Sequence, residues 1–492
     1  MTLAGQRALE AAAFEEAQGN FKSALSLTGG VDSAERADLL ANLAIAESGL
    51  ERWEVALENL RESLEVYIRV GNRDLIGKKF SELTDALIVA GRFDEAAETA
   101  RRGLAYLEGD VSVNRVHLLD GLSQALAWAE GYEPAHEALE EALKLASQLS
   151  DPKLVARLVG VRSIVNFHFF RLREAVDDGF QSEQMSGSEA PPWQRALRLR
   201  SLYPALVYLG RTQDAARVAN EVESLARKIG QSFPIAQCRT MNAWIEFGKA
   251  PDLARLEASL KQFLKSDQTP QFAFWAVSTE AQLSLLDFYR GNWTDALVHA
   301  QASCRAEPAS SSEGLGAGTL FRQMAYAGDR AGALASFDEK RGWMPGVGQR
   351  NPRGSWSMLA LVIEGFAMLG ERSRAAELYP LARELISTGA VALWPISRLT
   401  RTIAGVSAAA ARQWEAAEHY FETALQQAES FPHLLEQEDI RRFHAMMLID
   451  RAAPGDREKA QTLLRDALES YARIGMPRHI EMARMLLDRA AM

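Results

Sequence analysis

The segment GRFDEAAETARRGLAYL (91–107) decides the fold of this chain. It opens on a glycine, which is followed by an aromatic residue and, three residues after that, by Ala96. The segment GNWTDALVHA (291–300) repeats this order around Ala296. Glycine just past a helix end takes the left-handed conformation at little cost. Each segment therefore predicts a glycine turn between two helices.

An anchor residue at this position returns about every forty residues along the chain. The anchors are Ala24, Ala56, Ala96, Ala135, Ala175, Ala215, Leu253, Ala296, Ala333, Ala375, Ala417 and Ala460. A fixed period of this size indicates helical units that stack on their neighbours. The chain is therefore expected to consist of twelve such units.

Particular side chains accompany the anchor at fixed offsets. An aromatic residue stands three residues before six anchors: Phe21, Trp53, Phe93, Tyr132, Trp293 and Trp414. Twelve residues before the anchor, small residues are Ala12, Ala44, Thr84, Ser123, Ser163, Ser284 and Gly405. Seven residues after it, they are Ser63, Gly103, Ala142, Ser182, Ser303, Ala382, Ala424 and Ala467. Small side chains at a helix contact allow the two helix axes to come close together.

This pattern resembles the tetratricopeptide repeat over roughly residues 4–472. The resemblance implies an all-α fold, a right-handed α-solenoid superhelix of about twelve helix pairs with a C-terminal capping helix. In that family the first helix of each pair lines a concave groove that receives a protein or peptide. The implied function is a non-catalytic interaction scaffold without a cofactor or a metal.

The repeat is weaker in the middle of the chain. Larger residues replace the first small residue at Tyr203, Met241, Gln323, Ile363 and Leu448. We expect units six, seven, nine and ten to be degenerate. We divide the chain into N-terminal repeats (1–185), central repeats (186–340), and C-terminal repeats with the capping helix (341–492).

Three segments rich in turn residues interrupt the pattern, at 184–192, 306–318 and 341–355. They predict longer loops between helices. A hinge at 184–192 is the alternative for the first of them.

The C-terminal block, QWEAAEHYFETALQQAES (413–430) and the sequence of 448–487, supports a narrower resemblance. It is similar to the C-terminal tail of bacterial multidomain signalling ATPases, in which a cyclase or a helix-turn-helix module can accompany the repeats. Gly475 and Pro477 predict a helix end and a final helix over 478–489. The resemblance implies a regulatory array, with an upstream ATPase or cyclase module as a candidate partner.

Composition limits the function classes. The chain has 492 residues, of which 47% are hydrophobic, and a net charge of −10. This charge argues against a general nucleic-acid surface. The most apolar stretch (358–370) contains Glu364 and is too short to span a bilayer. We therefore expect a cytoplasmic protein without a membrane or nucleic-acid partner.

The usual catalytic motifs do not occur. The sequence has no P-loop, no H-E-x-x-H and no paired-cysteine motif around Cys238 or Cys304. GLGAG (314–318) is interpreted as part of a Ser-rich loop. The acidic stretch LLEQED between His433 and His444 is interpreted as a solvated helix surface. These observations favour a protein that is not an enzyme.

Groove positions follow from the resemblance, which places them 18, 15, 11 and 7 residues before each anchor. The candidates are His117, Asp120, Gln124, Trp128, Arg157, His168, Arg200, Asn242, Glu246, Ser278 and Tyr289. Trp128 is more typical of a core residue, because a large apolar side chain on a helix usually packs in the core. Arg195, Arg198 and Arg200 form a basic run that suits an acidic peptide or a terminal carboxylate, or else a solvated face.

Two functional hypotheses remain open beside the scaffold of a bacterial signalling system. One is a small-ligand sensor that controls a cyclase, an ATPase or a transcription module on another chain, for which we expect a closed cavity near units five to seven. The other is a DNA-binding regulator fragment, which the negative charge opposes.

Overall fold

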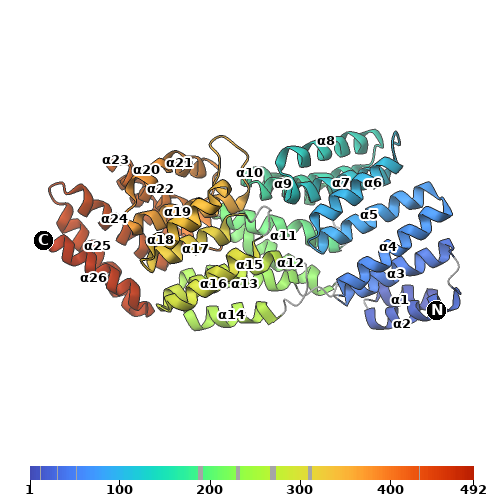
Figure 1. The fold of residues 1–492 in the computed structure, drawn as a ribbon, viewed down its shortest axis with the longest axis horizontal. Coiled ribbons are helices and arrows are strands. Elements are labelled where there is room, and N and C mark those ends of the chain that lie inside the picture. Colours follow the sequence, from blue (N-terminus) through green and yellow to red (C-terminus); the bar gives the residue numbers. More distant parts are fainter. Residues whose placement is uncertain are drawn as a thin grey trace.

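The computed structural model describes the chain except for residues 12, 30–31, 51, 187–191, 229–232, 266–272, 308–312 and 432. The described residues fold into helices that pair along the chain, and we call the first helix of each pair A and the second B. The two ends of the chain lie at opposite ends of the long axis (Figure 1). The prediction of an all-α solenoid is confirmed.

Units one to six each contain one A and one B helix. They are α1 (Thr2–Glu10) and α2 (Phe14–Leu27), α3 (Ala34–Gly49) and α4 (Trp53–Val70), α5 (Arg73–Val89) and α6 (Phe93–Tyr106), α7 (Val113–Ala129) and α8 (Tyr132–Gln148), α9 (Pro152–His168) and α10 (Leu172–Ser186), and α11 (Pro192–Tyr208) and α12 (Thr212–Lys228).

Units seven to twelve continue the series and end in an additional helix. They are α13 (Phe233–Lys249) and α14 (Leu253–Lys265), α15 (Ala273–Arg290) and α16 (Trp293–Ala306), α17 (Leu315–Tyr326) and α18 (Arg330–Lys340), α19 (Arg353–Leu369) with α20 (Arg372–Glu377) and α21 (Tyr379–Ser387), α22 (Thr400–Ala410) and α23 (Trp414–Ser430), α24 (Leu434–Arg451) and α25 (Asp456–Ile474), and finally α26 (Pro477–Ala491).

Polar caps fix where the A helices of units two to five begin. The side chains of Ser33, Asn72, Ser112 and Asp151 each accept a hydrogen bond from a backbone N–H in the first turn of the following helix. Such caps satisfy amide groups that have no partner within the helix. The caps recur at nearly the period of the anchors, so the repeat sets the helix starts as well as the packing.

Small hydroxyl residues join the two helices of a pair. Ser123, Ser163 and Ser284 donate hydrogen bonds of 2.6–2.8 Å to the carbonyl oxygens of the anchors Ala135, Ala175 and Ala296. Ser63, Ser182 and Ser303 donate bonds of 2.7 Å in the other direction, from B helices to the carbonyl oxygens of Ala37, Ala156 and Val277. The small residues at both offsets therefore permit close approach and also bond across it.

The anchors predicted for units one and seven were wrong. In unit one Ala17 is fully buried three residues into α2, and a Cβ on Gly5, twelve residues earlier, would lie 2.6 Å from the Phe21 ring. Ala17 is therefore the anchor, and Ala24 is the small residue seven positions after it. In unit seven the buried Leu256 holds the anchor position, whereas Leu253 begins α14. Both corrections bring the spacing closer to forty residues.

Two of the three predicted loops contain more structure than expected. The first turn of α17 includes most of GLGAG, where Glu307 accepts hydrogen bonds from the amides of Gly316 and Ala317. In 341–355, the short 3-10 helix η3 (Arg341–Trp343) and the start of α19 flank an irregular segment. The hinge predicted at 184–192 falls mainly outside the described residues.

A small insertion follows unit ten. Strands β1 (Ala392–Leu393) and β2 (Arg398–Leu399) pair antiparallel, with Ala392 opposite Leu399, between α21 and α22. Pro380 lies in the first turn of α21, beside the break that separates it from α20. The insertion places Arg398 inside the C-terminal units.

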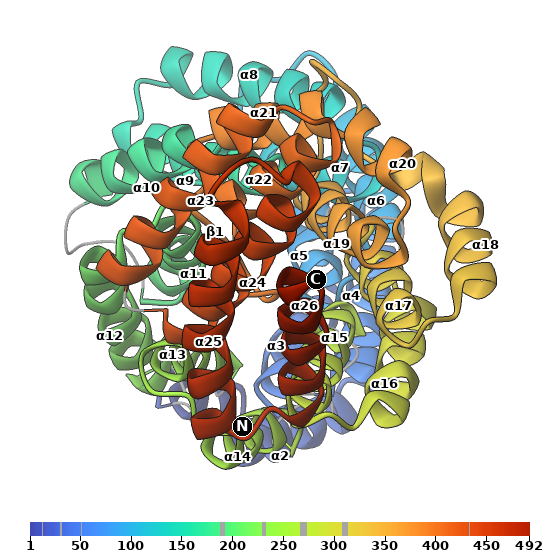
Figure 2. The same cartoon turned by 90° about the vertical axis from the view of Figure 1, so that its left-hand side faces the viewer.

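The solenoid winds tightly enough for its successive turns to touch. Along the superhelix, α8 to α18 show B helices at the rim and A helices nearer the centre (Figure 2). The Val391 amide donates a hydrogen bond of 2.8 Å to the Tyr208 carbonyl oxygen. A Cβ on Gly248 would lie 3.3 Å from the His433 ring, and one on Gly291 would lie 2.9 Å from Pro477. Each contact spans about 185 residues, so one turn takes between four and five units.

Candidate functional site

A polar cluster lies on the A helices of units three to five. Arg157 of α9 donates a hydrogen bond of 2.5 Å from Nε to the Asp120 carboxylate of α7, and its Nη2 lies 3.8 Å from the Asp85 carboxylate of α5. Gln124 also donates to Asp120, over 2.9 Å. Asp120 is fully buried, so its charge depends on Arg157 for compensation. The structure thus brings together three predicted groove residues.

His117 lies beside this cluster in α7. Burial and the neighbouring Arg157 guanidinium both lower the pKa of His117, while the Asp120 carboxylate opposes them. The imidazole of His117 consequently carries no charge at neutral pH.

Trp128 and His168 meet at the end of the same helices. The Trp128 ring stacks on Phe93 with a centroid distance of 4.7 Å, and His168 contacts it edge-on at 3.8 Å. Trp128 is half-buried and His168 is buried. Both residues therefore belong to a stack that joins units three, four and five, which fits the core interpretation of Trp128.

Further inner-face residues in units two and three were missed by the sequence analysis. Lys79 Nζ lies 2.8 Å from Glu82 and 3.8 Å from Asp38, and the Tyr67 hydroxyl donates to Asp38 over 2.8 Å. Ile45 lies on the same helix face as Asp38 and is 54% exposed. Asp38, Asp85 and Ile45 stand at the groove offsets before Ala56 and Ala96, so the predicted anchors of units two and three already marked these positions.

Units six and seven present a different inner face. The Tyr203 hydroxyl donates to Asn242 Oδ1 over 2.6 Å, and Trp244 Nε1 donates to Gln282 Oε1. Tyr203, Met241 and Trp244 are buried in the main hydrophobic core. With Leu256 as the anchor, Asn242 and Glu246 no longer occupy groove offsets. Glu246 is exposed and pairs with Lys249 of its own helix.

The predicted basic run is largely neutralised. Arg195 and Arg198 both lie 3.0 Å from the Glu183 carboxylate, and Arg195 also pairs with Glu221. Arg198 is buried. The side chain of Arg200 lies outside the described residues, so its predicted role stays a prediction.

The inner positions of the C-terminal units hold a buried ion network. Arg398 of β2 donates hydrogen bonds of 2.8 Å to Glu364 of α19 and to Glu436 of α24, and its Nη1 lies 2.6 Å from Asp439. All four side chains are at most 1% exposed. Burial raises the pKa of Glu364, but the Arg398 and Arg322 guanidinium groups outweigh it and lower that pKa to about 2. The contact with Glu364 therefore rests on charge, whereas burial raises the pKa of Glu436 to about 7 despite the neighbouring Arg398.

Aromatic hydroxyls extend this network across units nine to twelve. The Tyr326 hydroxyl donates to Glu364 over 2.8 Å, Arg442 donates to the Tyr326 oxygen over 3.2 Å, and the Tyr471 hydroxyl donates to Asp439 over 2.6 Å. The acidic stretch LLEQED is thus in part a buried core, and interpreting it as a solvated surface was wrong. Glu436 and Asp439 are fully buried, and His433 and His444 are nearly so.

Tyr289 was also wrongly placed in an open groove. The returning helix α26 covers it, since the His479 ring lies 5.9 Å from Tyr289 and 4.9 Å from Phe288. Tyr289 is fully buried, and burial raises the pKa of its hydroxyl. The inner face of unit eight is therefore closed by the chain itself.

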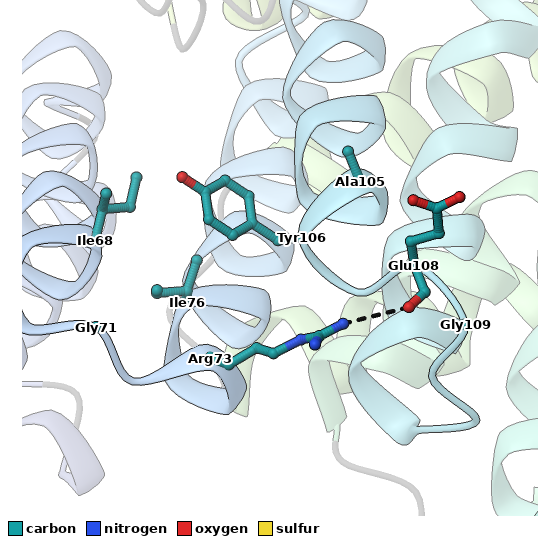
Figure 3. Close-up of a pocket in the computed structure, with 8 residues that line it drawn as sticks. All are labelled: Ile68, Gly71, Arg73, Ile76, Ala105, Tyr106, Glu108 and Gly109. Carbon is teal, nitrogen blue, oxygen red and sulfur yellow. Dashed lines mark hydrogen bonds between the residues drawn. The ribbon is translucent and has the colours of Figure 1, made fainter.

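An open pocket lies elsewhere, where units two and three adjoin. It has a volume of about 710 Å³ and sits at the turns that lead from B helices into A helices (Figure 3). Its lining consists of Ile68, Gly71, Arg73, Ile76, Ala105, Tyr106, Glu108 and Gly109. Arg73 donates a hydrogen bond of 3.3 Å to the Glu108 carbonyl oxygen across the pocket.

The described residues show neither a metal-binding cluster nor a membrane-spanning helix. Among the residues that the structure describes, no group of three or more His, Cys, Asp or Glu side chains has a geometry that could hold a metal ion. None of the helices in this part of the chain combines the length and the apolar character needed to cross a membrane.

Among known proteins, similarity to this chain is found only in solved structures. No protein-family model and no curated protein matches the chain. The Rap protein complexed with Competence and Sporulation Factor is 12% identical, with 69% of this chain and 94% of that chain covered and a TM-score of 0.42. A chain of the APC/C hetero-tetramer Cut9-Hcn1 is 12% identical, with 100% of this chain and 95% of that chain covered and a TM-score of 0.41. Yeast Tom70 is 13% identical, with 100% and 94% covered and a TM-score of 0.34.

Proposed function

We propose that the chain is a non-catalytic scaffold that binds a protein or peptide on the inner face of units two to five. The observation that carries this proposal is the exposure of inner-face residues in units two and three. Asp38 and Ile45 are exposed there, and His117 and Arg157 of units four and five are half-buried beside the buried Asp120 and His168. In the C-terminal units, Tyr289, Glu364 and Arg442 are all buried.

The chemistry of the accessible face suits a peptide. Ile45 offers an apolar contact, and Asp38 and Glu82 offer carboxylates on the same face. Burial raises the pKa of Asp85 to about 7, so this side chain can also donate a hydrogen bond. A face that alternates apolar contact with charge binds an extended segment or a helix through a few anchor side chains. The buried pair Asp120–Arg157 would hold α7 and α9 in a fixed spacing and so preorganise the face.

The experiment compares two arginine substitutions of equally exposed apolar residues. Ile45→Arg alters the inner face, and Val298→Arg alters the outer helix α16, where the side chain is 55% exposed. The full-length wild-type chain and both variants are used as bait, and every captured protein is then measured for affinity. We expect the partner to bind Val298→Arg like the wild type and Ile45→Arg about tenfold more weakly. Equal affinity for all three would overturn the assignment.

We further propose that the array serves a bacterial signalling system, with an upstream ATPase or cyclase module as its partner. The support is the similarity of the C-terminal block, 413–430 and 448–487, to the tails of such proteins. A purified module of this kind encoded beside the gene, tested for direct binding to the chain, decides the matter. Absence of binding would contradict this part of the proposal.

The small-ligand alternative has weaker support. Tyr203, Met241 and Trp244 occupy the inner region of units six and seven, where we expected a cavity, and they are buried against other core residues. A thermal-shift screen with nucleotides and common metabolites tests this alternative, because a ligand that binds only the folded state raises the melting temperature.

A further inference from the structure

Exposed apolar residues flank the pocket-lining residues of units two and three in the sequence. Val70 precedes Gly71, and Tyr106, Val111 and Val113 surround Gly109 in sequence; all four side chains are exposed. Single exposed apolar residues are ordinary on a protein surface, but a contiguous group beside a pocket marks an interaction site. We call this surface, together with the pocket lining, the turn-edge patch.

The turn-edge patch occupies an edge of the solenoid that is covered in later units. There the turns before α19 and α26 pack on the preceding superhelical turn. Arg353, the first residue of α19, stacks on the Phe167 ring at 4.9 Å, and Arg478, the second residue of α26, lies over Trp293 at 5.5 Å. The edge that begins the A helices is thus a docking edge within this chain.

The segment that leads into α19 shows the same chemistry. Arg350 lies 4.2 Å from the centroid of the Tyr132 ring and 3.5 Å from Glu133. Two arginines at the start of helices, Arg353 and Arg478, and one just before such a start, Arg350, therefore contact aromatic rings of an earlier unit. A guanidinium group over an aromatic face is favourable because the ring carries negative potential on that face.

Arg73 stands at the corresponding place in the turn-edge patch. It is the first residue of α5, as Arg353 is the first residue of α19. Its side chain is 56% exposed and holds Asp110 and the Glu108 carbonyl oxygen only at 3.3 Å. Ile68, Ile76 and Tyr106 form apolar walls beside it (Figure 3).

We propose that the turn-edge patch docks a partner protein, which inserts an aromatic side chain into the pocket against Arg73. This goes beyond the inner-face function, since it uses a different edge of units two and three. The pocket supplies apolar walls for the ring and a guanidinium group for its face. The covered edge at α19 and α26 indicates why the inserted side chain is aromatic, because rings meet the arginines there.

Random linear peptides displayed on phage, selected on the full-length chain, test the proposal. The affinity of each selected peptide is then measured for the wild type and for Arg73→Glu, Tyr106→Asp and Arg101→Glu. Arg101 is the control, because it is similarly exposed and pairs with Glu130 away from the pocket. Circular dichroism melting establishes that each variant is folded.

We expect selected peptides to share an aromatic residue and to lose about tenfold or more in affinity for Arg73→Glu and Tyr106→Asp, but not for Arg101→Glu. Binding should persist in Ile45→Arg, which separates this surface from the inner face. Peptides without an aromatic residue, or equal affinity for wild type and Arg73→Glu, would overturn the proposal. So would self-association of the chain that Arg73→Glu abolishes, because it would make a second copy the occupant.

Discussion

Arg398 and Glu436 form a fully buried ion pair of 2.8 Å between β2 and α24, two elements that lie 38 residues apart. Arg398 also neutralises Glu364 and Asp439, so one guanidinium group serves three carboxylates. A buried pair of this kind adds little net stability when intact, but removing one partner leaves uncompensated charge.

Substitution of Arg398 by methionine should therefore destabilise the C-terminal units by about 3–5 kcal/mol. Urea unfolding followed by circular dichroism measures this loss. Arg374→Met is the matched control, because Arg374 makes a loose pair of 3.7 Å with Asp338 at the surface. An Arg398→Met variant as stable as Arg374→Met would show that the network carries no uncompensated charge.

Substitution of Arg157 should likewise lower the stability of the N-terminal half, and a second substitution at Asp120 should restore it. Arg157→Met leaves the buried Asp120 without its cation and should cost several kcal/mol, on the order of 3–5. Replacing Asp120 by leucine in the same chain removes the stranded carboxylate. The double variant should then recover most of the lost stability. If it does not, Arg157 contributes through its packing and not through charge.

His479 should make the C-terminal units acid-sensitive. Burial lowers the pKa of His479 in the folded chain to about 3, well below the ordinary histidine pKa of about 6.5. Because the pKa of His479 is lower in the folded state than in the unfolded state, the unfolded state binds the proton first as the pH falls. The free energy of unfolding is therefore highest above about pH 6.5 and decreases below it. The loss is about 1.4 kcal/mol for each pH unit below that value.

His479→Phe keeps an aromatic ring beside Phe288 and removes the titrating group. The fall in melting temperature between about pH 7 and about pH 5 should be smaller in this variant than in the wild type. An identical fall in both proteins would mean that other groups, such as the buried His433, account for the acid sensitivity.

Two glycines of unit one test the corrected register. Gly5→Ala places a Cβ 2.6 Å from the Phe21 ring and should loosen the contact of α1 with α2, at a cost of about 1–3 kcal/mol. Gly19→Ala meets nothing within 4 Å and should stabilise α2 by about 0.5–1 kcal/mol. Hydrogen exchange of α1 and α2 reports both changes. Equal protection in the two variants would argue for the original anchor, Ala24.

The repeat could be read from the sequence because each unit packs mainly on its neighbours. The aromatic, the small residues and the glycine turn are local requirements of one helix pair, and they recur. In unit one the sequence imitates the pattern at the wrong place, because Phe21 precedes Ala24 by three residues. The true anchor is Ala17, and Phe21, four residues after it, packs on Gly5.

The closure of the C-terminal inner face could not be read in this way. It depends on contacts that span about 185 residues, such as the one between Tyr208 and Val391, and these follow from small rotations summed over several units. The charges of Glu436 and Asp439 looked like solvated surface because nothing local indicates the Arg398 that compensates them. The site residues of units three to five were predicted better, since their partners lie one unit away.

Hydroxyl-radical footprinting of the full-length chain, with and without its captured partner, tests the central claim most directly. Val89, seven residues before the anchor Ala96, stands at a groove offset and is 42% exposed. The binding account predicts that the partner protects Ile45 and Val89 while Val298 on the outer helix stays equally reactive. Protection of Val298 with Ile45 and Val89 unchanged would contradict the account.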